Sequence, residues 1–467
     1  MGRFRIVVAV SAAVLACVVA VSAVPAGTRG SRVTTQELTI TASDGTRLAC
    51  GLVLPPGSAP AGGWPGVLLF HGLGQTHVPM EAIAAAALAP VGFASLACDA
   101  RGTGGSGGKF GLDGPSEVQD ARDLFAWLAG RADVSDTAIG AVGLSLGGGE
   151  VWNAAVAGVP FKAIVPAIGW TDLARALAPA GVPKAGLIGG LGPAGSSWDP
   201  TLAQARDDLL SGSVTPAVEA ALAKRSSRPR LHALQVPTLI LQGRHDFLFD
   251  LDQGLAAYRL LAGPKRLYLG DLGHAPASNP AAEQPAYLVE VVRWLEKYLA
   301  GGPKFGGGVE LAHDPWDGTT SFSRALPGAR RVSVNLPGTK TLAAHGSLHR
   351  TVRLPGGPLE TFGDGYLDVR YTDAGQAWAQ LVGTVSVRGR AVPVTEGAAR
   401  VTRPSGVLRI PLMDQAVLLP RGKKLVVTVG SVSKDGVYRA PSAGGSASIT
   451  VRRVTLSLSL LRRAVSR

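Results

Sequence analysis

The chain has 467 residues, of which 46% are hydrophobic and 17% charged, and this composition excludes an intrinsically disordered protein. It carries 46 Lys and Arg against 33 Asp and Glu, a formal net charge of +13. Residues 1–302 hold 23 basic and 23 acidic side chains, whereas residues 303–467 hold 23 basic and 10 acidic ones. The excess of positive charge therefore belongs to the last third, which predicts two domains with different electrostatics.

The first residues have the pattern of a secretory signal. Arg3 and Arg5 precede an apolar run over residues 6–24, and small residues then offer a Val-x-Ala cleavage site. We expect residues 1–26 to be a signal peptide, which predicts a secreted or cell-envelope-associated protein. Two alternatives stay open: an uncleaved anchor, because a run of this length can just span a bilayer, and lipidation at Cys17.

Two cysteines lie outside the predicted signal, and each ends a β-like apolar stretch. Cys50 and Cys98 are too few to make a disulfide scaffold. They are either two small buried thiols or a bridged pair, and a bridge requires the two strands to be neighbours.

Short apolar β runs alternate with helical patterns from Glu37 to about Ala300, which indicates an α/β fold. Fully apolar strands are typical of a parallel sheet that is covered by helices on both faces. The strands are expected at residues 38–41, 48–54, 66–70, 93–98, 138–142, 163–168, 238–241 and 266–269. Helices are expected near residues 80–89, 119–129, 148–156, 252–261 and 287–299.

One long segment interrupts this alternation. Residues 170–231 are rich in Ala, Gly and Pro, are helical in parts, and follow directly after a predicted strand. We expect a helical cap insertion that overhangs the carboxyl ends of the strands, where open α/β sheets bind ligands.

The motif that indicates nucleophilic catalysis is Gly143-Leu144-Ser145-Leu146-Gly147. It lies between a predicted strand and a predicted helix. This context predicts a nucleophile elbow, in which the serine occupies a strained turn and the two glycines let the backbone pass closely. The sequence therefore predicts Ser145 as the nucleophile.

Ser145 needs a histidine as general base, and the candidates can be narrowed by their order in the chain and their position relative to the strands. His71 follows a strand but precedes the serine, whereas elbow serines are followed in the chain by the acid and then the histidine. His274 stands just past the last apolar strand, and His245 is interpreted as a loop residue beside the acid. We therefore predict His274 as the base. His232 lies far from any strand end, and three further histidines lie beyond the α/β unit: His313, His345 and His349.

The acid is expected after the strand that precedes the histidine. Asp246 stands in Gly243-Arg244-His245-Asp246, directly beyond such a strand, where it would orient His274 and stabilise its protonated form. The weaker candidate is Asp172. Three other carboxylates are interpreted as solvated or helix-start charges: Asp250, Asp252 and Asp271.

An acyl-transfer site also needs N–H donors for the developing oxyanion. The predicted donors are the backbone amides of Leu146, directly after the nucleophile, and of Leu73, after the third strand.

A second glycine-rich segment does not indicate a nucleotide. Gly102-Thr103-Gly104-Gly105-Ser106-Gly107 fits a dinucleotide pattern, but three residues separate it from the strand and no helix follows at once. No Cys/His cluster has zinc spacing either. The sequence therefore implies no cofactor and no metal.

A glycine-rich linker, residues 300–308, separates the α/β unit from a β-rich tail. Alternating strands are expected there at residues 331–335, 366–371, 379–387, 406–410, 424–429 and 446–458. This pattern predicts a β-sandwich. The predicted boundaries are thus 33–302 for the catalytic domain and 303–467 for the sandwich.

Taken together, these motifs resemble the α/β-hydrolase superfamily. With the β-rich tail, they are similar to its X-Pro dipeptidyl-peptidase and cocaine-esterase branch. The motifs, in this order, are His71-Gly72-Leu73-Gly74, Asp99-Ala100-Arg101-Gly102-Thr103-Gly104-Gly105-Ser106, Gly143-Leu144-Ser145-Leu146-Gly147, Gly243-Arg244-His245-Asp246 and Gly273-His274.

The resemblance implies an eight-stranded, mostly parallel sheet, a Ser-Asp-His triad and a jelly-roll tail. It also implies that strands two and four are neighbours, the condition for a Cys50–Cys98 disulfide. Two positions differ from the branch, which usually has a tyrosine after the third strand and often one after the nucleophile. Here Leu73 and Leu146 give the pattern that is common in esterases and lipases.

The predicted function is a secreted serine hydrolase that cleaves ester or peptide bonds of a small molecule through an acyl-enzyme. The triad does not separate an X-Pro dipeptidyl-peptidase from an acyl esterase, although the few charges early in the insertion suggest an apolar pocket. The alternative is a non-catalytic envelope-binding protein that uses the fold as a scaffold. For the basic tail, an anionic cell-envelope polymer or lipid is expected, not nucleic acid.

Overall fold

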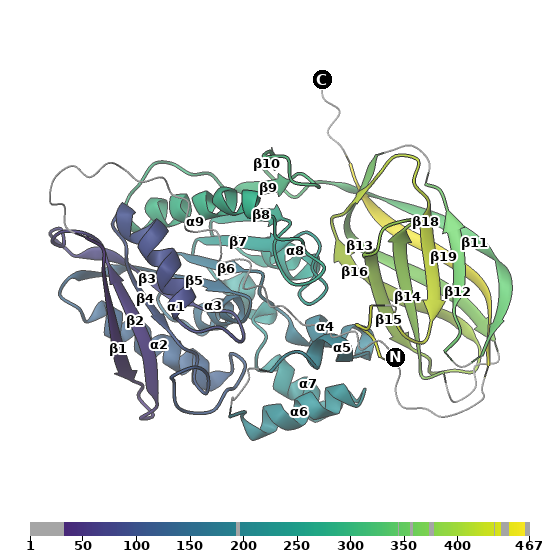
Figure 1. Cartoon of the computed structure of the whole chain (residues 1–467), viewed down its shortest axis with the longest axis horizontal. Coiled ribbons are helices and arrows are strands. Elements are labelled where there is room, and N and C mark those ends of the chain that lie inside the picture. The colour runs from purple at the N-terminus through teal and green to yellow at the C-terminus, as the bar shows by residue number, and fades with distance from the viewer. Residues whose placement is uncertain are drawn as a thin grey trace.

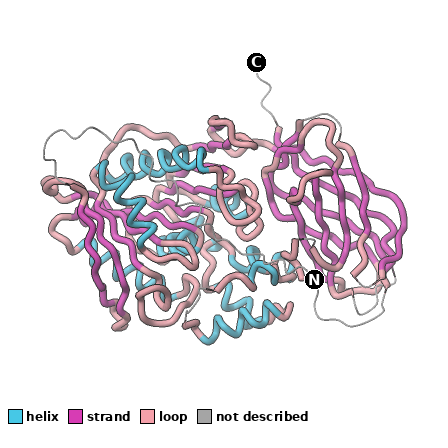
Figure 2. The backbone as a smooth tube through the Cα atoms, in the orientation of Figure 1, coloured by secondary structure: helices cyan, strands magenta, loops and turns pink. Residues whose placement is uncertain are grey.

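The structure is a computed structural model that describes residues 32–192, 197–343, 345–354, 358–372, 378–433, 435–439 and 448–462. The predicted signal peptide, with Cys17, lies outside the described residues. Two domains lie side by side, the first with helices around a sheet and the second built of strands (Figures 1 and 2). None of the helices in the described part is both long and apolar enough to cross a membrane.

The first domain is built on one ten-stranded sheet with the order β1-β2-β4-β3-β5-β6-β7-β8-β9-β10. The strands from β4 to β9 pair in parallel, and β1, β2 and β10 are antiparallel to their neighbours. The first eight strands match the expected sheet. The strands are β1 (Thr34–Thr41), β2 (Arg47–Leu54), β3 (Trp64–Phe70), β4 (Ala94–Cys98), β5 (Val134–Leu144), β6 (Ile164–Ala167), β7 (Thr238–Gly243), β8 (Lys265–Gly270), β9 (Gly308–Ala312) and β10 (Thr320–Ser323).

Helices cover both faces of this sheet, which explains why central strands such as β4 and β7 are buried along their whole length. One core lies under α2, α3 and α8, and the other lies under α1 and α9, where Trp294 is fully buried. The helices are α1 (Val78–Ile83), α2 (Pro115–Ala129), α3 (Leu146–Val156), α8 (Leu251–Leu260) and α9 (Gln284–Leu299).

The predicted insertion forms a helical cap between β6 and β7. Its two longer helices begin at side-chain caps, Asp199 and Thr215, each followed by a proline that fits the first turn. Apolar residues of the cap pack against Leu146 and Phe249, so the cap covers the carboxyl end of the sheet. The cap helices are α4 (Leu173–Leu177), α5 (Ala185–Ile188), α6 (Pro200–Leu210) and α7 (Pro216–Ala223).

The second domain is a sandwich of two antiparallel sheets. The main path of one sheet is β11-β19-β13-β16, with β17 paired to β13, and the other is β12-β18-β14-β15. This is the strand order of a jelly roll, and one apolar core fills the space between the sheets. The strands are β11 (Ala329–Leu342), β12 (Leu348–Val352), β13 (Leu359–Thr372), β14 (Gln380–Val387), β15 (Pro393–Arg400), β16 (Gly406–Gln415), β17 (Leu418–Leu419), β18 (Leu425–Gly430) and β19 (Ile449–Leu461).

The structure moves the domain boundary expected at residue 302. Strands β9 and β10 follow the glycine-rich linker, yet they extend the sheet of the first domain, so that sheet has ten strands where the sequence predicted eight. Strand β9 pairs in parallel with β8 because α9 returns the chain to the edge of the sheet. The sandwich therefore begins at β11, with Ala329.

Strands β2 and β4 are neighbours, as the family resemblance implied. Cys50 and Cys98 lie directly opposite each other in this antiparallel pair, and a disulfide joins them. The bond lies inside the sheet, with both residues buried.

Candidate active site

Ser145 occupies the sharp turn between β5 and α3. Its φ of 58° is in the left-handed region, which is strained for a residue with a side chain. The turn is also tightly packed, because a Cβ at Gly143 would lie 1.9 Å from the carbonyl oxygen of Gly147, and one at Gly147 would lie 2.1 Å from that of Phe70. Glycine is therefore required on both sides of the serine, which is the local reason for the sequence pattern.

The structure brings Ser145, His274 and Asp246 together. Ser145 Oγ lies 2.7 Å from His274 Nε2, and His274 Nδ1 lies 2.8 Å from Asp246 Oδ2. Asp246 is completely buried, and its carboxylate also accepts backbone N–H bonds from His274, Leu248 and Phe249. These bonds fix the carboxylate, which in turn fixes the ring of His274 with Nε2 facing the serine.

The loop that carries Asp246 is held by the second domain, a support that the sequence did not reveal. Residues 244–250 lie against β16 and the residue after it, and Phe247 belongs to an apolar cluster with Val382 and Met413 of the sandwich. Four hydrogen bonds join the two. Gln415 Nε2 donates to the carbonyl oxygen of Asp246 (3.0 Å), and the amide of Asp414 donates to Asp250 Oδ2 (3.1 Å). The amide of Ala416 donates to the carbonyl oxygen of Arg244 (2.7 Å), and Arg244 Nε donates to that of Ala416 (2.8 Å).

The other histidines near strand ends lie away from Ser145 Oγ. His245 Nε2 contacts the carbonyl oxygen of Pro393 at 3.0 Å, so it faces the second domain. His71 Nδ1 donates to the carbonyl oxygen of Gly72, and its Nε2 accepts from the amide of Ala100. Burial lowers the pKa of both histidines, which favours their neutral forms. His71 and His245 are therefore hydrogen-bonded to backbone groups, whereas His274 is the histidine that contacts Ser145.

The rival carboxylates have other partners. Asp172 caps α4 by accepting from the amide of Arg175, and Asp271 accepts from the amide of Ser278. Asp252 pairs with Arg228. Asp250, which starts α8, accepts from the second domain as described above.

The glycine-rich segment after β4 wraps around an aspartate. Gly105 donates its amide to Asp99 Oδ2 at 2.7 Å, and Ser106 Oγ donates to the carbonyl oxygen of Asp99 at 2.8 Å. The segment is thus a set of turns that holds Asp99.

A small apolar cavity of about 30 Å³ lies beside the Ser145–His274 pair. It includes Leu73 and Leu146, the residues whose amides are predicted to form the oxyanion hole; that role stays a prediction. Among the described residues that line it, Ser145 and His274 are the polar ones. The lining consists of Leu73, Leu112, Ser145, Leu146, Trp170, Leu173, Leu177, Leu191, Leu248, Phe249 and His274. The pocket therefore suits an uncharged group.

Comparison with known proteins gives the family and the fold. Residues 44–276, about half of the chain, match the family of X-Pro dipeptidyl-peptidases (S15 family). No curated protein matches the chain.

Similar solved structures cover both domains. A CocE/NonD family hydrolase from Staphylococcus aureus superposes with a TM-score of 0.69 at 14% identity, over 91% of this chain and 94% of that one. An α-amino acid ester hydrolase has a TM-score of 0.69 at 14% identity, over 95% and 99%. An aminopeptidase from a marine sediment Thaumarchaeota archaeon has a TM-score of 0.68 at 14% identity, over 94% and 99%.

These likenesses confirm the fold predicted from the sequence, including the all-β second domain. With the family match, they show that the chain belongs to the α/β-hydrolase superfamily, in the branch of the X-Pro dipeptidyl-peptidases and CocE-like hydrolases, and that it is a hydrolase.

Proposed function

We propose that the protein is a serine esterase that acts on short, uncharged acyl esters through an acyl-enzyme. The observation that carries the proposal is the apolar cavity beside Ser145 and His274. The family and fold leave the choice between ester and peptide substrates open, so the proposal of an esterase rests on the lining of this pocket.

The reaction begins when Ser145 Oγ adds to the ester carbonyl carbon while its proton passes to His274 Nε2. The developing oxyanion accepts hydrogen bonds from the amides of Leu73 and Leu146. Collapse of this intermediate breaks the bond to the alcohol, which leaves with the proton from His274. Water then attacks the acyl-serine by the same route and releases the carboxylic acid. Asp246 stabilises the imidazolium that forms in each half-reaction.

The lining of the pocket argues against a dipeptidyl-peptidase. Such a substrate carries an α-ammonium group close to the scissile bond, and a buried cation needs a carboxylate partner. No lining residue among the described part of the chain is acidic, and the carboxylate of Asp246 is already occupied by His274. An acyl group without charge needs no such partner.

The size of the cavity favours a short acyl chain. A space of about 30 Å³ exceeds the roughly 10–15 Å³ that one water needs by about two- to threefold, so it holds about two or three heavy atoms. An acetyl group, with three heavy atoms, is of this size. Longer chains would have to displace leucines of the cap.

Fluorophosphonate labelling and a substrate panel test the proposal together. We expect the wild type to label and Ser145→Ala to lose labelling, because only an activated serine attacks the probe. On p-nitrophenyl esters, kcat/KM should fall at least tenfold from acetate to octanoate. Ala-Pro p-nitroanilide should be hydrolysed far more slowly than the acetate ester.

Ser211→Ala is the matched control, because Ser211 is exposed after α6 and should leave labelling and turnover unchanged. Equal labelling of the wild type and Ser145→Ala would contradict the nucleophile and favour the scaffold alternative. A preference for the anilide would keep the nucleophile but overturn the esterase assignment.

Secretion is part of the proposal. The charged start and apolar run of residues 1–26 support it, and the disulfide agrees with an oxidising compartment.

A further inference from the structure

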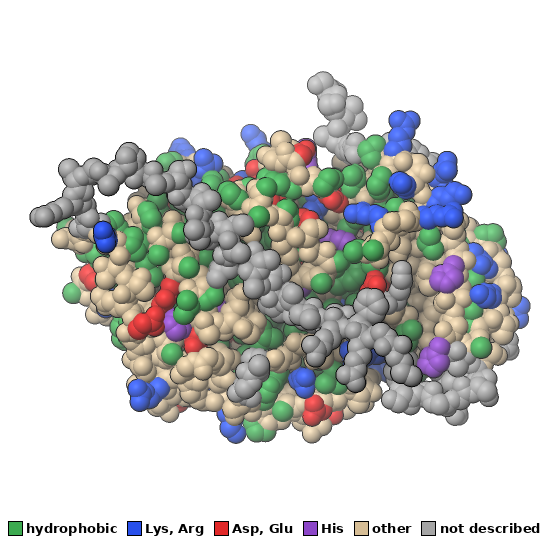
Figure 3. Space-filling model, viewed as in Figure 1, with side chains coloured by type: hydrophobic (Ala, Val, Ile, Leu, Met, Phe, Trp, Pro, Cys, Tyr) green, Lys and Arg blue, Asp and Glu red, His purple; other side chains and the backbone are tan. Residues whose placement is uncertain are grey.

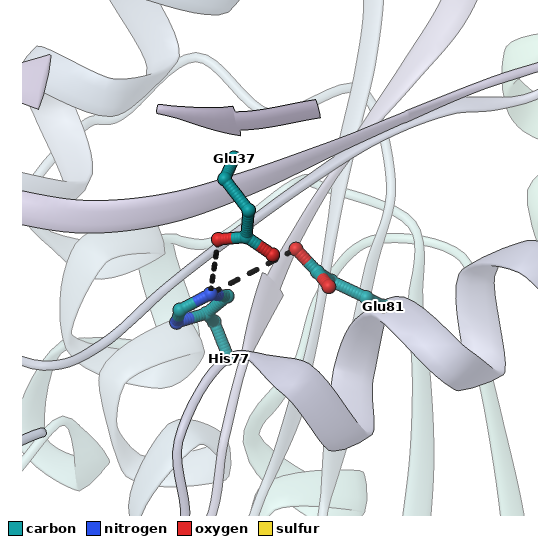
Figure 4. Close-up of side chains that lie close together, drawn as sticks. All are labelled: Glu37, His77 and Glu81. Carbon is teal, nitrogen blue, oxygen red and sulfur yellow. Dashed lines mark hydrogen bonds and ion pairs between the residues drawn. The ribbon is translucent and has the colours of Figure 1, made fainter. Parts of the chain in front are cut away.

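A second cluster of ionisable side chains lies at the edge of the first sheet. Glu37 comes from β1, His77 precedes α1, and Glu81 lies one turn further along in that helix (Figure 4). His77 Nε2 is 3.1 Å from Glu37 Oε2 and 3.9 Å from Glu81 Oε1, and the three donor atoms all lie within 4.8 Å of one another. Two carboxylates and one imidazole nitrogen therefore converge on one point.

Asp99 orients the ring of His77. Its Oδ1 lies 2.7 Å from His77 Nδ1 and also accepts the backbone amide of His77 at 2.6 Å, and Asp99 is 2% exposed. The turn after β4 holds this carboxylate in place. Because Nδ1 faces Asp99, Nε2 is directed at the two glutamates. A carboxylate behind the imidazole is the support that metal-ligating histidines usually have.

Glu81 is a buried carboxylate with one oxygen that is not hydrogen-bonded to the described residues. The residue is only 7% exposed, and its buried Oε1 makes no hydrogen bond to the described residues. The carboxylate fills the space above Gly51 of β2, where a Cβ would lie 1.0 Å from Oε1. A buried carboxylate without a partner is costly unless a cation neutralises it.

An ion pair with a protonated histidine explains only part of the cluster. A protonated His77 would donate to Asp99 and to Glu37, at 2.7 Å and 3.1 Å. The third carboxylate, Glu81, would still stand 3.9 Å from Nε2 with its inner oxygen unpaired. A bound cation would satisfy Glu37 and Glu81 together, since it can contact both oxygens and Nε2 at once.

We propose that Glu37, His77 and Glu81 bind a divalent metal ion of the zinc class, through His77 Nε2 and one oxygen of each glutamate. Zinc bonds of roughly 2.0–2.2 Å place neighbouring donors about 3.4 Å apart in a tetrahedron, close to the two separations from Nε2. The imidazole favours zinc over magnesium or calcium, and water completes the coordination. On binding, any proton on Nε2 passes to solvent while Nδ1 keeps its proton for Asp99.

The ion would connect β1 to the segment that leads to the active site. His77 ends the loop that follows β3, and Leu73, a predicted oxyanion donor, lies in that loop. Glu37 has a side chain 68% exposed, so the ion can enter from solvent. The spacing in sequence gave no sign of this site, because Glu37 is far from the other two ligands and no second histidine or cysteine is involved.

Zinc binding to the chelator-treated full chain tests the proposal by isothermal titration calorimetry. We expect one equivalent to bind to the wild type and a rise in its unfolding temperature with zinc. Glu81→Gln, which keeps the shape of the side chain, and His77→Ala should each bind at least tenfold more weakly. Asp99→Asn should weaken binding by about 10–100-fold, as expected for loss of the orienting carboxylate.

Two control variants separate this site from other zinc-binding histidines. His274→Ala removes the histidine of the candidate active site, and His313→Ala removes an exposed histidine that faces Asp317. Both should retain the full equivalent. The proposal is overturned if the wild type takes up no zinc, if Glu81→Gln binds as tightly as the wild type, or if either control abolishes binding. Circular dichroism of each variant verifies folding, and Glu81→Gln suffices if His77→Ala does not fold.

Discussion

Glu396 is a carboxyl buried in the second domain without full hydrogen bonding. It is completely inaccessible; Thr384 Oγ1 donates to its Oε2 at 3.3 Å, and its Oε1 makes no hydrogen bond to the described residues. Burial, with the nearby charge of Asp435, raises the pKa of Glu396 to about 8. At neutral pH the native protein therefore keeps this group largely protonated.

The pH dependence of stability follows from this proton. Between its ordinary pKa of 4.5 and about 8, the native state holds a proton on Glu396 that the unfolded chain releases. The free energy of unfolding should therefore fall as pH rises through this range, by at most about 1.4 kcal/mol per pH unit from this group. Glu396→Gln, which cannot titrate, should show a shallower fall. Urea denaturation of both proteins at pH 5 and pH 8 measures the difference; parallel curves would contradict the prediction.

Strands β2 and β4 are the pair of elements that a covalent bond joins. Cys50 and Cys98 are 48 residues apart in sequence, so their bond closes a loop that contains β3 and α1. Closing a loop of this length reduces the entropy of the unfolded chain by an amount equivalent to about 4 kcal/mol. The disulfide therefore stabilises the edge of the sheet that also carries Glu37 and Gly51.

Removing the Cys50–Cys98 disulfide should lower the stability of the protein. We expect Cys50→Ala/Cys98→Ala to unfold with a free energy lower by about 2–4 kcal/mol than the oxidised wild type. Guanidinium denaturation with and without reductant measures this difference in the free energy of unfolding. The midpoint of the double variant should be the same with and without reductant. If the wild type, verified as reduced by mass spectrometry, kept its midpoint, the bond would have no stabilising role.

Elements with a simple pattern could be predicted from the sequence, and those with a mixed pattern could not. Strand β7 was predicted because it contains the apolar run Leu239-Ile240-Leu241. The elbow around Ser145 was predicted because glycines there meet a local steric demand. Strand β15 was missed because its sequence, Pro-Val-Thr-Glu-Gly-Ala-Ala-Arg, does not alternate and buries a glutamate. Strand β9 was predicted for neither domain, since its place depends on where α9 returns the chain.

The candidate active site also has a part that could be predicted from the sequence and a part that could not. Ser145, Asp246 and His274 each follow a strand, so chain order and strand ends were enough to select them. The contacts between β16 and the loop of residues 244–250 join segments that are far apart in sequence, and no local pattern encodes them. The cluster of Glu37, His77 and Glu81 was missed for the same reason.

On the scale of the whole molecule, the excess of positive charge belongs to the sandwich itself, which is shorter than the domain predicted to begin at residue 303. With the sandwich starting at Ala329, residues 329–467 hold 21 basic and 7 acidic side chains, and the rest of the chain is almost neutral. Basic side chains gather on the second domain in Figure 3. Exposed Arg370 and Arg453 lie directly opposite each other on β13 and β19, where like charges repel unless an anion lies nearby.

We therefore expect the full chain to bind vesicles that contain phosphatidylserine at low salt and to leave them at high salt. Each arginine near an anionic surface contributes about 1 kcal/mol, so Arg370→Glu/Arg453→Glu should bind at least tenfold more weakly in co-sedimentation. The matched control is Lys162→Glu/Lys224→Glu, which makes the same charge change on exposed residues of the first domain. Equal loss in both variants would show that net charge alone matters, and no binding by the wild type would remove the envelope surface as a partner.

The bonds from β16 to the loop of Asp246 make the sandwich a support of the candidate active site, although none of its described residues lines the pocket beside Ser145. A chain truncated after β10 would keep all three residues of the triad and lose the support of its acid. Exchanging the sandwich for that of a relative would likewise alter how firmly the imidazole is aligned, even with an unchanged first domain. The two domains have separate cores, yet the position of the proposed catalytic acid depends on both of them.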